Sequence, residues 1–424
     1  MNNSVSQELL KFLQKSPTAF HAVQQMRSEL LAVDFTELKE NQRWNIECGK
    51  HYFVTRNDSS LIAFTIPENG IDKMHILTSH SDSPTFKIKE NPEIEVEKHY
   101  VKLNVEKYGG MLCAPWFDRP LSVAGRVIIK DKTNGQFTSK LVNIDRDLVM
   151  IPNLAIHMNR EINSGYNYNA QKDLLPLYGC GSPKGTFMEQ IAEAAGVEKD
   201  EILGHDLFLY NRQEGSIWGL LKNSFPAADL MTCSVPLHHF KVFFPVRKKN
   251  VWLYTVFWIM KKLEAVRNRA PHPRSLFDTL IRVHEALGYD GEDYRVHLAD
   301  SFMISADNAH AVHPNYTEKA DPTNRPYLNE GIVLKFNANQ KYCTDAVSAA
   351  MFRDLCKRAD VPVQTFTNRS DMAGGSTLGN ISNTQVALNT VDIGLPQLAM
   401  HSPYETAGVK DTEYLVRAAK EFFC

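Results

Sequence analysis

This chain of 424 residues has few cysteines and no leading apolar segment. Its seven cysteines are scattered, their number is odd and no C-x-x-C pair occurs. That usage is typical of a reducing compartment and argues against a disulfide framework. Residues 1–20, MNNSVSQELLKFLQKSPTAF, contain no apolar stretch of the kind that a secretory signal requires. We therefore expect a cytoplasmic protein.

The chain also lacks a charge excess and a long apolar run. Its formal net charge is −2 and its pI is near 6.7, so nothing favours binding to nucleic acid or to an anionic membrane. The run VWLYTVFWIM at residues 251–260 is too short to cross a bilayer, which takes roughly 20 residues. We expect neither a nucleic-acid nor a membrane partner. The hydrophobic content of 43% is enough for a large core in two or more domains.

The spacing of apolar residues predicts helices at both ends of the chain. Residues 5–32 have helical spacing that is interrupted at Ser16-Pro17-Thr18, a break followed by a new helix start. Residues 52–66 predict two strands around a polar turn that begins at Asn57. Further helices are expected at 188–195, 277–287, 346–358 and 412–423, and short strands at 74–78, 363–366 and 385–388. This mixture predicts an α/β sheet.

Residues 85–150 have the alternating pattern of strands instead. Strands are expected at 86–89, 94–101, 123–130 and 148–151, with turns at Gly109-Gly110 and Asn134-Gly135. We interpret this part of the chain as a mostly β insert in the α/β sheet.

Three segments place histidine or aspartate beside apolar runs. His80 and Asp82 follow a short buried strand, Asp307 lies in SADNAHAVHPN, and His401 lies in LAMHSPYE. Histidine is a common zinc ligand, and a nearby carboxylate can orient its second ring nitrogen. Each segment alone also fits a capped turn or a solvated histidine.

A fourth segment contains the pair Gly374-Gly375. Two glycines allow the backbone to approach a ligand closely. No lysine follows as in a P-loop, so phosphate binding is not favoured, and a plain tight turn is the alternative.

Taken together, the segments resemble the M18 family of zinc aminopeptidases, the aspartyl aminopeptidase-like enzymes. The matching strings are HSDSP at 80–84, WFDRPL at 116–121, IPNLAIHMNR at 151–160, DLFLYN at 206–211, SADNAHAVHPNY at 305–316, LKFNANQKY at 334–342, GGSTLG at 374–379 and TVDIGLPQLAMHSPYE at 390–405. The resemblance implies an α/β zinc-exopeptidase domain, with a mixed sheet flanked by helices, at 1–90 and 220–424. It implies an inserted β-rich domain at 91–219 that serves assembly and completes the active site.

The resemblance also implies a set of site residues. Its zinc ligands would be His80, Asp307 and His401, and Asp82 would support the first of these as a catalytic residue. His157 would be associated with the metal and reached from a neighbouring subunit. The substrate site would be lined by Lys335, Gly374, Gly375 and Ser376.

The function implied is metal-assisted hydrolysis of peptides. M18 enzymes are cytoplasmic di-zinc exopeptidases that remove N-terminal residues, often acidic ones, and assemble as tetrahedral dodecamers. Zinc polarises the scissile carbonyl and supplies a hydroxide, and a carboxylate carries the water proton to the leaving amine. We therefore expect peptide substrates, a homo-oligomer, and two zinc ions per subunit or fewer in this chain.

Residues 222–274 depart from the family pattern. A box like R-L-D-[DN] should supply a bridging carboxylate and a [DN]-x-E-E-[VI]-G-S box the general base, yet neither is present. If residues 258–265 are written as TGG ATA ATG AAG AAG TTG GAA GC, a start at the third base gives Asp-Asn-Glu-Glu-Val-Gly-Ser. The same offset over 228–233 can give Arg-Leu-Asp-Asp-Leu. Our hypothesis is a pair of compensating frameshifts near Lys222 and Ser275.

The missing boxes leave two functional alternatives. The chain is either a zinc aminopeptidase or a catalytically inactive M18-like scaffold that lacks the base and the bridging carboxylate. For the literal sequence we expect negligible peptidase activity. A third interpretation, a membrane-associated protein, rests only on the apolar run at 251–260.

Overall fold

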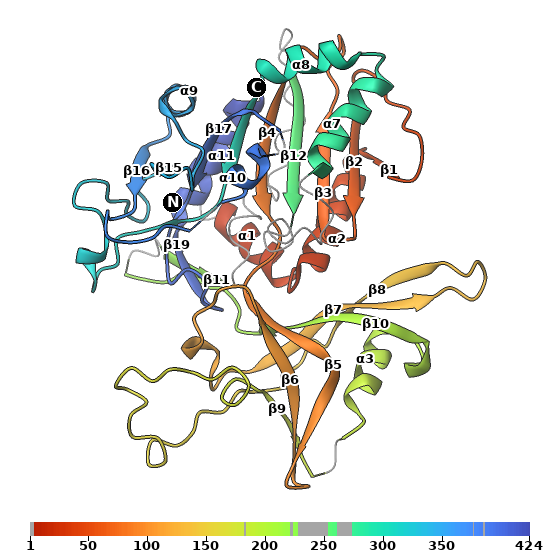
Figure 1. The fold of residues 1–424 in the computed structure, drawn as a ribbon, viewed down its shortest axis with the longest axis vertical. Coiled ribbons are helices and arrows are strands. Elements are labelled where there is room, and N and C mark those ends of the chain that lie inside the picture. The colour runs from red at the N-terminus through yellow and green to blue at the C-terminus, as the bar shows by residue number, and fades with distance from the viewer. Residues whose placement is uncertain are drawn as a thin grey trace.

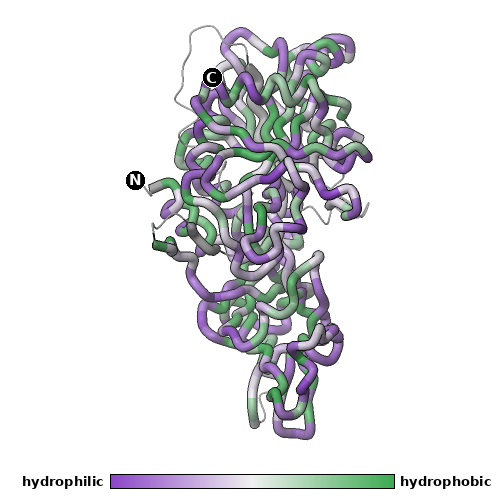
Figure 2. The backbone as a smooth tube through the Cα atoms, turned by 90° about the vertical axis from the view of Figure 1, so that its left-hand side faces the viewer, coloured by the Kyte–Doolittle hydropathy of each residue, from purple (hydrophilic) through white to green (hydrophobic). Residues whose placement is uncertain are grey.

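The structure is a computed structural model that describes residues 4–181, 184–220, 224–227, 253–260, 274–375, 377–384 and 386–424. Figure 1 shows an upper body in which helices surround a sheet, and a lower body built mainly of long strands. Both bodies contain the green hydrophobic stretches seen in Figure 2. In the described part of the chain, no helix is long and apolar enough to cross a membrane.

The upper body is organised on a mixed sheet with the strand order β1-β2-β3-β12-β4-β13-β17-β15-β16. These strands are β1 (Thr36–Leu38), β2 (His51–Arg56), β3 (Ser60–Thr65), β12 (Leu253–Met260), β4 (Lys73–His80), β13 (Phe302–Ala306), β17 (Asn389–Gly394), β15 (Ile332–Phe336) and β16 (Val363–Thr367). The central neighbours β12, β4, β13 and β17 are parallel. Their carboxyl ends therefore meet at one edge, where α/β sheets usually bind ligands.

Helices cover both faces of this sheet. They are α1 (Ser4–Gln14), α2 (Ala19–Leu31), α7 (Arg274–Ala286), α8 (Gly291–Ala299), α9 (Ala346–Arg358), α10 (Leu378–Asn383) and α11 (Val409–Phe423). One apolar cluster joins α1, α2, α9 and α11 to side chains such as Leu77 and Ile304. A second joins α7 and α8 to Ile76 and Met303. Consecutive strand residues belong to different clusters because side chains along a strand alternate between the two faces.

The lower body contains an antiparallel sheet with the order β8-β7-β10-β5-β6-β9. Its strands are β5 (Thr85–Val96), β6 (Tyr100–Tyr108), β7 (Leu121–Lys130), β8 (Phe137–Asn143), β9 (Leu177–Cys180) and β10 (Ile202–Asn211), and α3 (Phe187–Ala195) packs beside β8. A small sheet holds β11 (Ser224–Ala227), β14 (Ala309–His310), β18 (Pro396–Leu398) and β19 (Glu405–Gly408). Short 3-10 turns are η1 (Ala114–Trp116), η2 (Lys199–Glu201) and η3 (Thr317–Lys319). The proposed domain limits, 91–219 within 1–90 and 220–424, stay a prediction.

Most of the predicted elements are confirmed. The break at Ser16-Pro17-Thr18 separates α1 from α2, where Thr18 is the N-cap, although its hydroxyl bonds the ring of His21 at 2.8 Å instead of a backbone N–H. The predicted turn at Asn57 joins β2 to β3. The α/β class with a flanked mixed sheet is confirmed as well.

Three predicted strands are wrong. The one expected at 148–151 forms only isolated bridges at Val149, Met150 and Ile151. The expected strand at 94–101 is two strands, because Glu97 and Lys98 adopt left-handed backbone angles that turn β5 into β6. No glycine or asparagine marks that turn, so the sequence pattern missed it. At 385–388, residue 385 lies outside the described residues and 386–388 form no strand, because β17 begins at Asn389.

Residues 253–260, part of the aberrant segment, form β12 in the centre of the larger sheet. This strand is parallel to β4 along its whole length and antiparallel to β3. The run is rich in aromatic and β-branched residues, which favour strands, and this composition accounts for the pairing.

Candidate metal centre

His80 is the last residue of β4 and is almost fully buried. Its Nδ1 lies 2.8 Å from the backbone oxygen of Asp82. A carbonyl oxygen can only accept, so Nδ1 carries the hydrogen and donates it. The lone pair of the neutral ring is therefore on Nε2, the arrangement in which histidine binds a metal.

Asp307 directly follows β13, the parallel neighbour of β4. Its Oδ1 lies 3.5 Å from Nε2 of His80, and both side chains are about one-tenth exposed. Donors 2.0–2.2 Å from one tetrahedral zinc are separated by about 3.4 Å. The pair therefore fits two adjacent ligand positions of a single zinc ion.

Asp82 supports His80 from the side opposite Asp307. Its Oδ1 is 3.6 Å from Nδ1 of His80, and its Oδ2 accepts a hydrogen bond of 2.8 Å from the hydroxyl of Tyr108. Tyr108 ends β6, so the lower body contributes to the support of this carboxylate. Sequence reasoning missed Tyr108, because nothing local connects it to the H-x-D pattern at residues 80–82.

His401 lies on the loop between β18 and β19, with an exposed side chain and a left-handed φ of 66°. Its N–H donates to Oε1 of the buried Glu405 at 2.5 Å, and its carbonyl accepts from the N–H of Leu112 at 3.1 Å. Left-handed backbone at a residue other than glycine is uncommon and often found at functional sites. These bonds fix the backbone of His401, and its role as a zinc ligand stays a prediction.

His157 lies elsewhere, on the exposed loop that precedes β9 in the lower body. Within the described part of this chain, no contact joins it to His80 or Asp307. Its apolar neighbours are also exposed: Leu154 by 55%, Ile156 by 48% and Met158 by 74%. One chain alone therefore does not bring His157 to the other predicted ligands.

The predicted substrate-lining residues differ in their surroundings. The Nζ of Lys335 is buried and donates to the carbonyl oxygens of Asp307 at 3.0 Å and Asn308 at 3.1 Å. A Cβ on Gly374 would lie 2.5 Å from Oδ1 of Asn368, whereas one on Gly375 would meet no described atom within 4 Å. Ser376 lies outside the described residues.

Buried carboxylates shape the electrostatics of this region. Burial raises the pKa of Asp392, and the Lys335 ammonium opposes that rise. Burial, together with the carboxylates of Asp307 and Asp392, raises the pKa of Tyr342 to about 12. The Tyr342 phenol is therefore neutral at physiological pH. Sequence reasoning missed Asp392, although the TVDIG string contains it.

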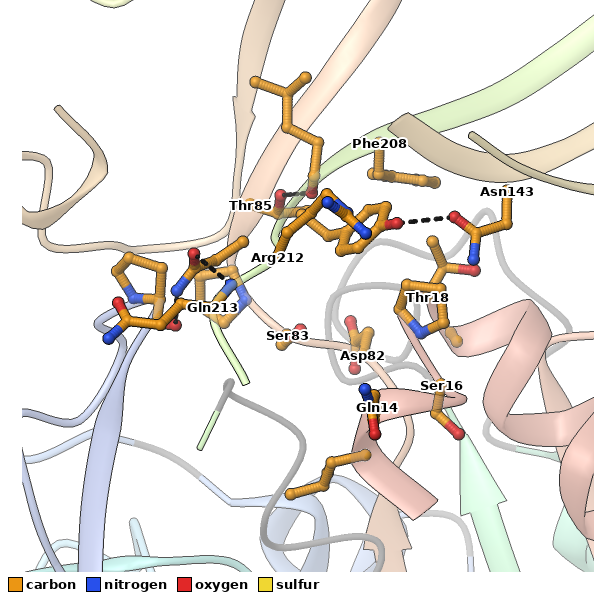
Figure 3. A pocket seen from close by; sticks show the side chains of 18 of the residues that line it. Gln14, Ser16, Thr18, Asp82, Ser83, Thr85, Asn143, Phe208, Arg212 and Gln213 are labelled. Carbon is orange, nitrogen blue, oxygen red and sulfur yellow. Dashed lines mark hydrogen bonds between the residues drawn. The ribbon is translucent and has the colours of Figure 1, made fainter. Parts of the chain in front are cut away.

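A cavity of about 290 Å³ borders Asp82 and lies between the α1–α2 connection and the end of β10 (Figure 3). Asp82, Thr18 and Phe208 contribute to its walls. Of the predicted site residues that the structure describes, Asp82 alone lines it. The cavity therefore borders the support of His80 rather than the His80–Asp307 pair.

The described residues supply only part of a metal site. Among them, no group of three or more His, Cys, Asp or Glu side chains is arranged to hold a metal ion. The two boxes that the M18 resemblance requires would fall in residues 222–274, most of which lie outside the described residues. The His80–Asp307 pair is therefore the core of the candidate centre.

Comparisons with known proteins point to one family of metalloproteases. The family model "Aminopeptidase I zinc metalloprotease (M18)" matches residues 12–233 and 274–423. The chain is 44% identical to a probable M18 family aminopeptidase 2 of Clostridium novyi over 100% of both chains. It is 41% identical to one of Clostridium acetobutylicum, over 99% of this chain and 98% of the relative.

Solved structures are similar over nearly the whole chain. The cryo-EM structure of the Ape4 and Nbr1 complex matches with a TM-score of 0.92 and 32% identity, over 99% of this chain and 85% of that one. The S. cerevisiae mApe1 dodecamer matches with a TM-score of 0.86 and 26% identity, over 99% of this chain and 96% of that one. The family model leaves 234–273 unmatched, which lies within the segment that we consider aberrant.

Proposed function

The chain belongs to the M18 family of zinc aminopeptidases, and from this membership we propose that, with the reading frame of residues 222–274 restored, it removes N-terminal residues, acidic ones among them, from peptides in the cytoplasm. The observation that carries the proposal is the 3.5 Å separation of His80 Nε2 and Asp307 Oδ1. Both atoms are zinc donors, and the separation suits adjacent ligands of one ion. We propose His80, Asp307 and His401 as ligands in a site for two zinc ions.

Each described residue has a definite part in this proposal. His80 binds through Nε2 because the carbonyl of Asp82 holds its Nδ1 hydrogen. The Asp82 carboxylate stabilises the ring orientation and is itself held by Tyr108. A zinc ion bound there supplies a Lewis acid for the scissile carbonyl and lowers the pKa of a bound water. No described atom lies within 4 Å of the position that a Cβ on Gly375 would take, which favours room beside the backbone for a peptide substrate.

The general base is the part that the literal sequence lacks. In the larger sheet, Met260 of β12 is paired in register with His80 of β4. The shifted reading frame encodes its Glu-Glu pair at codons 260–262, at that end of β12. This coincidence supports the frameshift hypothesis, because a base is needed beside the zinc ligands. It also supports the second candidate function, an inactive scaffold, for the chain as written.

Metal analysis and an activity assay test the proposal together. We expect the full chain to bind zinc and His80→Ala to bind it at least tenfold more weakly. Hydrolysis of aspartyl and leucyl chromogenic substrates by the chain as written should be negligible. A version with the frame restored between codons 222 and 275 should hydrolyse an N-terminal substrate. Normal turnover by the literal chain would contradict the account of the missing base, and absence of zinc from both versions would contradict the site.

A homo-oligomer is part of the same proposal. The similar S. cerevisiae protein is a dodecamer. The exposed apolar side chains of Leu154, Ile156 and Met158 lie beside His157, on a loop suited to contact with a second copy of this chain. Such a contact would carry His157 to the metal centre of a neighbouring subunit.

A further inference from the structure

Four buried polar side chains form a row across the larger sheet, below the level of His80 and Asp307. Pairing in register places Thr78 opposite Ser305, and Ser305 opposite Asp392. In the antiparallel β15–β17 pair, Leu334 lies opposite Ile393, so the next position along the same register places Lys335 opposite Asp392. Residues opposite one another in a sheet point to the same face. The row therefore crosses β4, β13, β17 and β15 on one face.

Lys335 connects this row to the predicted zinc ligand. It is 2% exposed, and its Nζ donates to the backbone oxygens of both Asp307 and Asn308. The ammonium also lies 5.3 Å from the ring centre of Tyr342. These contacts fix the backbone on which the Asp307 carboxylate is carried, so the position of that carboxylate depends on Lys335.

A buried ammonium needs a nearby negative charge, because its loss of hydration is costly. Asp392 is fully buried on the neighbouring strand, where burial raises its pKa and the Lys335 ammonium opposes that rise. Its Oδ2 also accepts a hydrogen bond of 2.6 Å from the N–H of Cys343, which fixes the carboxylate. Asp392 thus lies where a counter-charge for Lys335 is required.

The start of α10 closes over the row. The N–H of Gly379 donates to Oγ of Ser305 at 3.0 Å. A Cβ at Gly379 would lie 2.8 Å from Oδ1 of Asp392 and 2.9 Å from the Ser305 side chain. This close approach keeps water away from the row, and a low local dielectric strengthens the attraction between the buried charges.

We propose that Asp392 is a positioning residue of the metal centre, which holds Lys335 on the carbonyl groups of Asp307 and Asn308 and so fixes the Asp307 carboxylate. This inference rests on the proposed zinc function. It gives Lys335 the role of a buried tether, in place of the substrate contact that the family resemblance implies.

The test compares Asp392→Asn, Lys335→Met and the double variant in the full chain. Asparagine keeps an acceptor for the Cys343 N–H and removes only the charge. We expect Asp392→Asn to weaken zinc binding by about 10- to 100-fold in competition with a chelator. The double variant should bind zinc about as tightly as whichever single variant has the lower zinc affinity. The control, Asp360→Asn, changes a 98% exposed side chain and should leave zinc binding unchanged. Unaltered zinc affinity in Asp392→Asn would overturn the proposal.

Urea unfolding of the zinc-free variants separates this inference from the proposed function. A coupling between positions 335 and 392 in the unfolding free energies is expected, because residues that act as a pair are not additive. Additive effects would overturn the pairing whether or not zinc binds. If the unsubstituted chain binds no zinc, the proposed function fails. If positions 335 and 392 are nevertheless coupled, the pair stabilises the fold only, and its role in positioning a zinc ligand is overturned.

Discussion

At the scale of single residues, the proposed zinc site depends on which nitrogen of His80 carries the hydrogen. The Asp82 carbonyl decides this, because it accepts from Nδ1 and leaves Nε2 to face Asp307. The bond is local, and the H-x-D pattern at 80–82 already contains both residues, although that pattern alone also fits a capped turn. The hydroxyl of Tyr108, which completes the arrangement, comes from a distant strand.

Another buried carboxylate, Asp411 at the start of α11, should make stability depend on pH. Its two oxygens accept from the N–H groups of Asn329 at 2.6 Å and Gly331 at 3.1 Å. Burial outweighs these bonds and raises the pKa of Asp411 from 3.8 to about 7. Between pH 4 and 7 the folded form keeps a proton that the unfolded form has lost. The contribution of Asp411 to stability therefore falls as the pH rises through this range.

This falling contribution amounts to about 4 kcal/mol, since one pKa unit corresponds to 1.36 kcal/mol. Urea unfolding of the wild-type chain and Asp411→Asn should be compared from pH 4 to 8. The difference in unfolding free energy, wild type minus variant, should decrease up to pH 7 and then level off. A difference that is constant across the range would show that Asp411 does not titrate as described.

At the scale of elements, the candidate centre is the product of parallel strands that end at one edge. β4 ends in His80 and β13 leads into Asp307, and the two strands are direct neighbours. β17 continues the sheet next to β13 and approaches the Asp307 backbone very closely at Gly394. Position 394 has room for glycine alone, because a Cβ there would lie 2.0 Å from the Asp307 oxygen.

Gly394→Ala tests this close approach. The added carbon must displace the Asp307 backbone, so we expect a loss of about 1–3 kcal/mol in unfolding free energy, the range for overpacking a buried site, and weaker zinc binding. The control is Gly204→Ala on β10, where a Cβ would meet no described atom within 4 Å. If both variants have the same stability and zinc affinity, the close approach at Gly394 is not a constraint.

At the scale of the whole molecule, both the upper and the lower body contribute residues to the candidate site. The upper body carries His80 and Asp307, and the lower body contributes Tyr108 together with the apolar loop around His157. The aberrant segment still supplies β12, the strand between β3 and β4. The sheet is thus continuous through β12, while the carboxylates expected at the end of that strand are missing from the sequence.

Assembly is the prediction that belongs to this scale. Met158→Asp places a charge on the 74% exposed apolar side chain beside His157, and we expect it to lower the oligomer mass measured by light scattering. Phe137→Asp is the control, because Phe137 is 69% exposed on β8, away from that loop. Equal masses for the wild type and Met158→Asp would remove the 154–158 loop from the proposed contact between copies.

The sequence by itself determined the local features of this protein. Apolar spacing identified helices such as α9, whose bounds 346–358 match the prediction, and short motifs identified the family. These features depend on residues that are close together in the chain. The turn at Glu97 and Lys98 was missed because no residue there favours a left-handed backbone.

Only the tertiary structure decided which of these segments meet. The adjacency of β4 and β13 sets the distance between His80 and Asp307, and no local pattern encodes the order of parallel strands. The same applies to Tyr108, Asp392 and Lys335, which reach the centre through pairings between segments far apart in the chain. Sheet order follows from the burial of whole strand faces against helices. It is therefore a property of the assembled core and not of any single segment.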